Sequence, residues 1–174
     1  MHEDRTKDFL DFAGTRAAHL FRSACLLTGG DTHLAEDLVQ ETLGTMYVTW
    51  RRIATVGNPA GYAQTVLVRT FLSHRRRRSS GESPTAALPD VPAGHDGTDS
   101  DTALLRLTLL DALARLAPKD RAVVILRYWE DRSVEETADA MRVSSSAVRT
   151  RSVRALARLR DLLGDSLAER VPSP

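Results

Sequence analysis

Residues 133–160 read SVEETADAMRVSSSAVRTRSVRALARLR, and this stretch decides the fold class. Ser133 and Glu136 stand three residues apart, which is the capping-box pattern of a helix N-terminus. Ser144 is placed to cap a second, longer helix after a short turn that contains Arg142. Two helices joined in this way predict a helix-turn-helix, and the simpler alternative is a solvated amphipathic hairpin.

The second of these helices carries most of the local positive charge. Between Arg142 and Arg160 the chain has six arginines and no acidic residue. In a helix-turn-helix the second helix enters the major groove, so a cationic second helix is typical of DNA binding. The charge and its position together favour a DNA-binding unit over a hairpin.

Residues 79–101 have a different composition from the rest of the chain. They include five acidic residues, no Lys or Arg, and several Pro and Gly. Such a segment cannot offset its ordering entropy by burial, so it predicts a linker. We therefore expect an N-terminal domain at 1–78, an acidic linker at 79–101 and a C-terminal domain at 102–174.

Apolar residues on both sides of this linker recur at helical spacing. Gly29-Gly30 predicts the end of one helix, Asp31 the cap of the next, and Asn58-Pro59 the start of another. No segment alternates long enough to predict a strand, so the predicted fold class is all-α, with two small helical domains. The two clearest apolar stripes are Leu34, Leu38, Thr42, Met46 and Trp50, and Leu105, Leu109, Leu113 and Leu116.

Several function classes are excluded by what the 174 residues lack. One cysteine, Cys25, cannot form a disulfide framework or a multi-cysteine zinc module. The charged N-terminus and the absence of a long apolar run predict neither export nor membrane insertion. No nucleotide-binding, hydrolase or metal motif occurs, and the histidines are scattered. We expect a cytoplasmic protein that is not an enzyme and needs no cofactor or metal.

Two parts of the chain resemble a known family. Residues 112–160 resemble the promoter −35-binding domain of extracytoplasmic-function sigma factors, and AEDLVQETL (35–43) resembles their polymerase-clamp-binding helix. NPAGYAQTVLVRTFLSHRRRR (58–78) is similar to actinobacterial SigE-like members. The resemblance implies a factor that binds core RNA polymerase through the clamp of the largest subunit and the flap of the second-largest. It also implies promoter DNA as a partner and an anti-sigma factor as a candidate regulator.

The resemblance also assigns roles to individual residues. The residues that would read the −35 element are Arg127, Arg149, Thr150, Arg151 and Arg154. Those that would bind and help to open the −10 region are Arg51, Arg52, Asn58, Tyr62, Arg69, Arg75 and Arg76. Those that would bind the polymerase clamp are Glu36, Asp37, Gln40 and Glu41.

Two residues qualify this assignment. Trp50 is expected in the core and not at the DNA surface. Family members usually have Gly where this chain has Arg142. A left-handed backbone costs a residue other than Gly on the order of 1 kcal/mol, so a slightly remodelled turn is expected.

Other functions are compatible with a helix-turn-helix. A stand-alone regulator would use the N-terminal half to sense a ligand or to dimerise, and an adaptor would bind polymerase without DNA. The acidic face at 36–41 and the arginines at 75–78 favour the sigma factor. The acidic linker is expected to mimic nucleic acid in a basic polymerase channel, and a plain spacer is the alternative.

Overall fold

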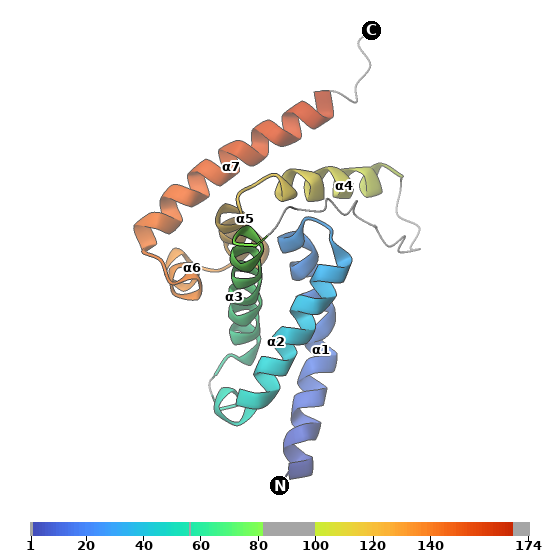
Figure 1. The fold of residues 1–174 in the computed structure, drawn as a ribbon, viewed down its shortest axis with the longest axis vertical. Coiled ribbons are helices and arrows are strands. Elements are labelled where there is room, and N and C mark those ends of the chain that lie inside the picture. Colours follow the sequence, from blue (N-terminus) through green and yellow to red (C-terminus); the bar gives the residue numbers. More distant parts are fainter. Residues whose placement is uncertain (1, 56, 82–99, 169–174) are drawn as a thin grey trace.

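The structure is a computed structural model that describes residues 2–55, 57–81 and 100–168. Almost all of these residues are helical and none forms a strand, so the predicted all-α class is confirmed (Figure 1). The elements are α1 (His2–Thr28), α2 (Thr32–Ile53), α3 (Pro59–Ser79), α4 (Ser100–Ala114), α5 (Pro118–Val124), the π-helical segment η1 (Ile125–Trp129), α6 (Val134–Met141) and α7 (Ser145–Ala168). The predicted contact of the linker with polymerase lies outside the described residues.

The turn between α1 and α2 follows the prediction from Gly29-Gly30 and Asp31. Both glycines have positive φ, 67° and 95°, and the Gly30 N–H donates to Cys25 O at 2.9 Å. This bond satisfies a carbonyl that the end of α1 leaves free. The Asp31 carboxylate accepts from the Leu34 N–H at 3.0 Å and caps α2. A side chain at Gly29 would also collide with Ala114, since an added Cβ would lie 2.5 Å from the Cβ of Ala114.

Helix α3 begins where Asn58-Pro59 predicts. The Asn58 side chain accepts from the Gly61 N–H at 2.8 Å, and Pro59 occupies the first turn, where its missing N–H is not needed. These local signals fix the end of the loop that precedes α3.

Helices α1, α2 and α3 pack into one N-terminal unit. Trp50 is only 6% exposed and packs against Phe9 and Phe12, with ring centroids 5.4 and 4.9 Å away. The prediction that Trp50 is a core residue is therefore confirmed. The whole α2 stripe is buried, namely Leu34, Leu38, Thr42, Met46 and Trp50.

The predicted stripe on α4 is only partly right. Leu113 and Leu116, which lies just beyond α4, are buried, but Leu105 and Leu109 are 57% and 36% exposed. In a helix of 3.6 residues per turn, side chains four positions apart differ in direction by about 40°. A row of such residues therefore winds around the helix and away from the core. The buried face of α4 consists of Thr108, Ala112 and Leu113, which lie in its C-terminal half.

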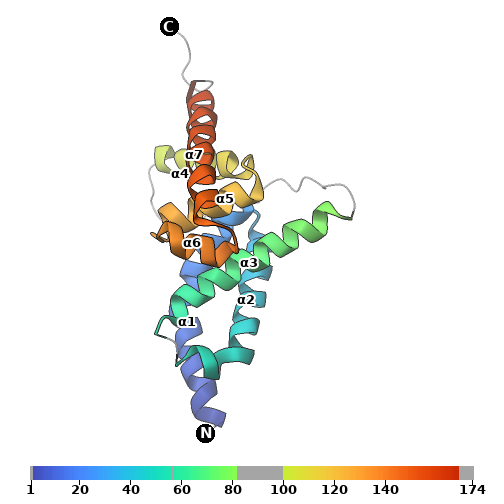
Figure 2. The same ribbon diagram turned by 90° about the vertical axis from the view of Figure 1, so that its left-hand side faces the viewer.

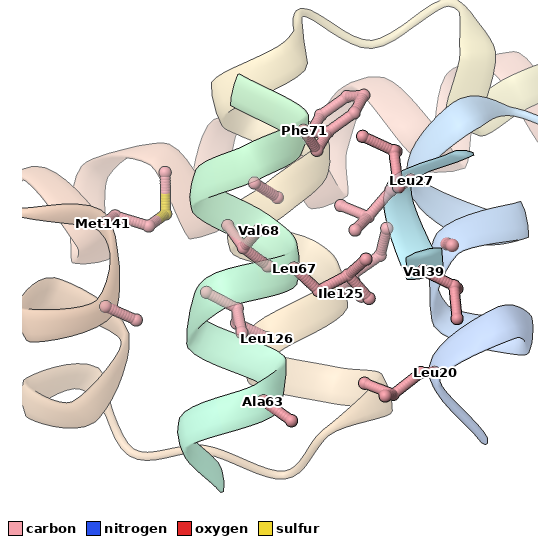
Figure 3. Close-up of a cluster of buried hydrophobic side chains, with 14 of the residues drawn as sticks. Leu20, Leu27, Val39, Ala63, Leu67, Val68, Phe71, Ile125, Leu126 and Met141 are labelled. Carbon is pink, nitrogen blue, oxygen red and sulfur yellow. The ribbon is translucent and has the colours of Figure 1, made fainter. Parts of the chain in front are cut away.

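The two helical units share one hydrophobic cluster. Figure 3 shows α3 between Met141 of α6 and Leu27 of α1, with Ile125 and Leu126 of η1 packed against it. Figure 2 shows α6 beside α3. The units therefore pack directly on each other in this arrangement, which we call the closed form.

A buried arginine on α5 connects the two units. Arg121 is 2% exposed and donates to Leu27 O at 2.6 Å, Ala114 O at 2.8 Å and Leu116 O at 3.0 Å. Its guanidinium also lies over the ring of Phe71, 5.8 Å from the centroid. Burial and the nearby Arg75 lower the pKa of Arg121 to about 10, so it stays charged at neutral pH.

Replacing Arg121 by Met should lower the free energy of unfolding by about 3–5 kcal/mol, because two buried carbonyls and a partly buried one lose their donor. Urea unfolding of the full chain measures this loss. Arg160→Ala, an exposed arginine at the far end of α7, should change stability by less than about 0.5 kcal/mol. Equal urea midpoints for the two variants would show that Arg121 does not hold the fold together.

Candidate nucleic-acid interface

The predicted helix-turn-helix is formed by α6 and α7. The Ser133 hydroxyl accepts from the Glu136 N–H at 3.0 Å, and the Glu136 carboxylate accepts from the Ser133 N–H at 2.8 Å. Hydrogen bonds from the backbone and the side chain of Ser133 to the Glu136 carboxylate lower the pKa of Glu136. The Ser144 hydroxyl accepts from the Ala147 N–H at 3.1 Å and starts α7. Both predicted caps are therefore confirmed.

The turn between α6 and α7 keeps the geometry that Gly usually supplies. Arg142 has φ 56° and ψ 46°, in the left-handed region. The Val143 N–H donates to Ala138 O at 3.0 Å, and the Arg142 N–H donates to Asp139 O at 3.3 Å. This pair of bonds is the Schellman motif that ends a helix. The expected remodelling of the turn is thus wrong, because Arg142 takes the strained conformation itself.

The arginines predicted to read the −35 element lie in different environments on α7. Arg149 and Thr150 are exposed, and Arg149 pairs with Glu135 at 3.3 Å on the surface. Arg154 also has an exposed side chain, whereas that of Arg151 is 27% exposed. Arg151 and Arg154 both bind Asp120 of α5, at 2.7 and 3.1 Å.

Arg127 lies on η1, and its guanidinium makes contacts within the chain. It donates to the backbone carbonyl of Arg132 and lies over the ring of Tyr128, 5.7 Å from the centroid. A contact between Arg127 and DNA therefore stays a prediction. In the closed form this guanidinium already has protein partners.

The candidate −10 residues fall into two groups. Arg51, Arg52 and Asn58 are exposed at the end of α2 and in the loop before α3, and Tyr62 is half-buried on the first turn of α3. Asn58 already uses its side-chain oxygen as a helix cap. Its amide nitrogen donates no hydrogen bond to the described residues.

Arg69, Arg75 and Arg76 form the second group, further along α3. Arg69 donates to Ala140 O at 2.8 Å and Asp139 O at 3.0 Å, at the C-terminal end of α6. Burial and the nearby Arg142 lower the pKa of Arg69. The closed form thus uses a predicted DNA contact to hold the two units together.

A cleft of about 1490 Å³ lies between α3 and the C-terminal unit. Its only acidic lining residues, among those that the structure describes, are Asp31 and Asp111. The cationic lining residues come from both units, and they are Arg69, Arg75, Arg76, Arg78, Lys119, Arg142 and Arg151.

The acidic face predicted on α2 is present. Glu36, Asp37, Gln40 and Glu41 are all exposed, and no ion pair within the described residues involves them. The adjacent apolar residues of α2 are buried, so this face can change without loss of the core.

A polar network between the units was not predicted from the sequence. The Glu130 side chain is 3% exposed and accepts hydrogen bonds from His19 at 2.9 Å and from Ser23 and Gln64. Arg132 donates to the Thr65 hydroxyl at 2.9 Å and to Gln64. Glu130 and Arg132 thereby connect the segment before α6 to α1 and α3.

Two further observations concern metals and membranes. Within the described residues, no three His, Cys, Asp or Glu side chains are grouped so that they could hold a metal ion. No described helix combines the length and the apolar character needed to cross a bilayer.

The fold and the arginine-rich α7 define a helix-turn-helix protein with a second helical unit. The sigma-70 region 2 model matches residues 15–81, and the sigma-70 region 4 model matches residues 112–161. RNA polymerase sigma-E factor of Streptomyces coelicolor is 39% identical over 90% of this chain and 86% of its own length. ECF RNA polymerase sigma factor SigL of Mycobacterium tuberculosis is 32% identical over 80% of this chain and 81% of its own.

A solved structure shares the same fold. The sigma factor RpoE from Bartonella quintana, in complex with the anti-sigma factor NepR, superposes with a TM-score of 0.70 at 25% identity, over 91% of this chain and 98% of that chain. The chain belongs to the extracytoplasmic-function sigma factors of the sigma-70 family. Sigma factors in general are not enzymes.

Replacing Arg142 by Gly should stabilise the protein by about 1 kcal/mol, because Gly adopts the left-handed backbone without strain. Thermal unfolding should show a midpoint about 2–4 °C higher. Arg158→Gly, at an exposed position inside α7, should instead destabilise by about 1 kcal/mol. A similar loss of stability in both variants would mean that the turn carries no strain.

Proposed function

We propose that this chain is the promoter-recognition subunit of an RNA polymerase holoenzyme. The proposal rests on the observation that the same chain has an exposed acidic helix in its region 2 unit and an arginine-rich recognition helix in its region 4 unit. The polymerase performs the chemistry, and this chain has no catalytic activity. It acts in the cytoplasm, as its similarity to sigma-E factors supports.

The proposed division of labour follows the three parts of the chain. Residues 1–78 bind the polymerase clamp and the −10 region, residues 102–174 bind the −35 element and the polymerase flap, and 79–101 connect them. Exposed cations at Arg51 and Arg52 suit the phosphates of a partly opened duplex. Tyr62 can stack on a base that leaves the duplex, and the Asn58 amide nitrogen can bind a base edge.

Promoter binding requires the two units to separate. The two promoter elements lie about one and a half duplex turns apart, roughly 50 Å. In the closed form, however, Arg69 of the −10 helix α3 binds the end of α6 at 2.8 Å. We therefore propose that the holoenzyme contains an open form, in which Arg69 is released to join Arg75 and Arg76 on DNA.

An anti-sigma factor is a further proposed partner. RpoE, whose fold is similar over 91% of this chain, was solved with the anti-sigma factor NepR. A protein that stabilises the closed form would keep α3 and α7 from reaching the promoter together.

Co-purification with core polymerase separates the proposal from a stand-alone regulator. A sigma factor should start promoter-specific transcription in a mixture of core polymerase, this chain, template and nucleotides. Binding to a palindromic site as a dimer, with no effect on polymerase, would instead establish a regulator.

Arg149→Ala should relax the choice of base at one position of the −35 element and cost about 1–3 kcal/mol of discrimination. Arg149 is exposed, and among the described residues it pairs only with Glu135, so it can exchange this carboxylate for a base edge. Binding of the holoenzyme to single-base variants of a promoter measures the effect. If Arg149→Ala lowered the affinity for every promoter variant equally, Arg149 would contact only a phosphate and would read no base.

Asp37→Lys should weaken binding to core polymerase without lowering the melting temperature, because an exposed site tolerates the change. Asp8→Lys is a control with the same change of charge on an exposed position of α1. The role of the acidic face would be refuted by equal effects of the two variants. It would also be refuted if Asp37→Lys lost helicity in step with binding.

A further inference from the structure

One carboxylate faces two arginines of the recognition helix. Asp120 is the third residue of α5 and is 8% exposed. Its Oδ1 accepts from Arg151 Nη1 at 2.7 Å and from Arg154 Nη2 at 3.1 Å, and its Oδ2 lies 3.3 Å from the same Arg154 nitrogen. The contacts join α5 to the middle of α7.

This pairing differs in kind from the one made by Arg149. Arg149 and Glu135 have side chains that are 62% and 66% exposed, 3.3 Å apart, so solvent screens the pair and a DNA phosphate or base can replace it. The Asp120 side chain is only 12% exposed, and its ion pairs are correspondingly less screened. The recognition helix therefore combines one arginine paired with an exposed carboxylate and two arginines paired with a largely buried one.

The two arginines bound to Asp120 also differ from each other. The Arg154 side chain is 60% exposed and uses one Nη for Asp120, so its other nitrogens are directed to no partner among the described residues. The Arg151 side chain is 27% exposed and lines the cleft beside α3. Arg154 can therefore contact DNA while it stays bound to Asp120, whereas Arg151 is turned toward the protein.

We infer that Asp120 is a specificity-determining positioning residue. It orients Arg154 toward a base edge, and it keeps Arg151, which the family resemblance assigned to the −35 element, from adding an unspecific phosphate contact. This inference rests on the proposed function, in which α7 enters the major groove. A guanidinium that is already held in place loses little side-chain entropy when it binds DNA. For a bidentate contact, its two parallel N–H groups must also be oriented toward the base edge. A free Arg151 would bind any phosphate within reach and so raise affinity for all sequences alike.

A purely structural role for Asp120 predicts something else. Val124 of α5 packs with Ala155 and Leu162 of α7 in a separate apolar cluster, so the two helices have a contact that does not depend on Asp120. Loss of the carboxylate charge should therefore change what α7 binds more than whether α7 folds.

The test uses the full chain assembled with core polymerase. Holoenzymes with the wild-type chain, Asp120→Asn, Asp120→Glu, Arg154→Ala and Glu135→Gln are titrated at several salt concentrations. The DNA is a duplex with the −35 hexamer that the wild-type holoenzyme selects from a random pool, and the same duplex with that hexamer scrambled. Asp120→Asn keeps the shape of the side chain, and circular dichroism confirms the fold of each variant.

Asp120→Asn should lower the ratio of specific to scrambled affinity by roughly tenfold. Its affinity for scrambled DNA should rise, with a salt slope steeper by about 0.9 for one added phosphate contact. Asp120→Glu should recover part of the ratio. Glu135→Gln should leave the ratio within about twofold of wild type, because its pair is exposed and screened.

Three results would overturn the inference. If Asp120→Asn keeps the ratio while Arg154→Ala loses it, Asp120 does not position Arg154, although α7 still reads the promoter. If Asp120→Asn weakens binding to both duplexes equally, its role is structural. If Arg154→Ala keeps the ratio, the proposed reading by Arg154 fails as well.

Discussion

One buried guanidinium, that of Arg121, joins the two units of the closed form. Arg121 binds Leu27 O near the end of α1, and it also binds Ala114 O and Leu116 O at the end of α4. Helix ends leave carbonyls without partners and carry partial negative charge, so a cation between two of them satisfies both. The arrangement fixes α5 between the units, and α5 in turn supports α7 through Asp120 and the apolar cluster around Val124.

Arg69 repeats this chemistry at the opposite side of α3, where it binds the end of α6. Besides the shared apolar cluster, the units are thus joined by arginines bound to backbone carbonyls and by Glu130 with its three partners. Water and the phosphates of DNA can replace such contacts more readily than they replace apolar packing. Arg69 is a direct case, because the same side chain serves the closed form and is proposed to serve the promoter.

Local signals were sufficient to predict where α2, α3, α6 and α7 begin. The caps at Asp31, Asn58, Ser133 and Ser144 depend on residues three or fewer positions away, so the sequence alone reveals them. The contacts of Arg121, Glu130 and Asp120 join residues that are distant in the chain, and spacing carries no information about them. In the sequence, the one sign of a buried cation is Arg121 at the start of the apolar run RAVVIL (121–126). The burial predicted for Leu105 and Leu109 was wrong for the same reason, since only neighbouring helices decide which face of α4 is covered.

Gly29 shows how closely the two units approach, because even a methyl group there would meet Ala114. Apolar packing loses a large part of its attraction over a gap of about 0.5–1 Å. A slightly parted state would therefore lose this packing before water fits between the units to bind the polar groups that are set free. Opening is then expected to be an all-or-none event with no stable half-open form. If polymerase accepts only the open form, the rate of holoenzyme assembly should stop rising at high polymerase concentration. The assembly rate cannot then exceed the rate at which the free chain opens.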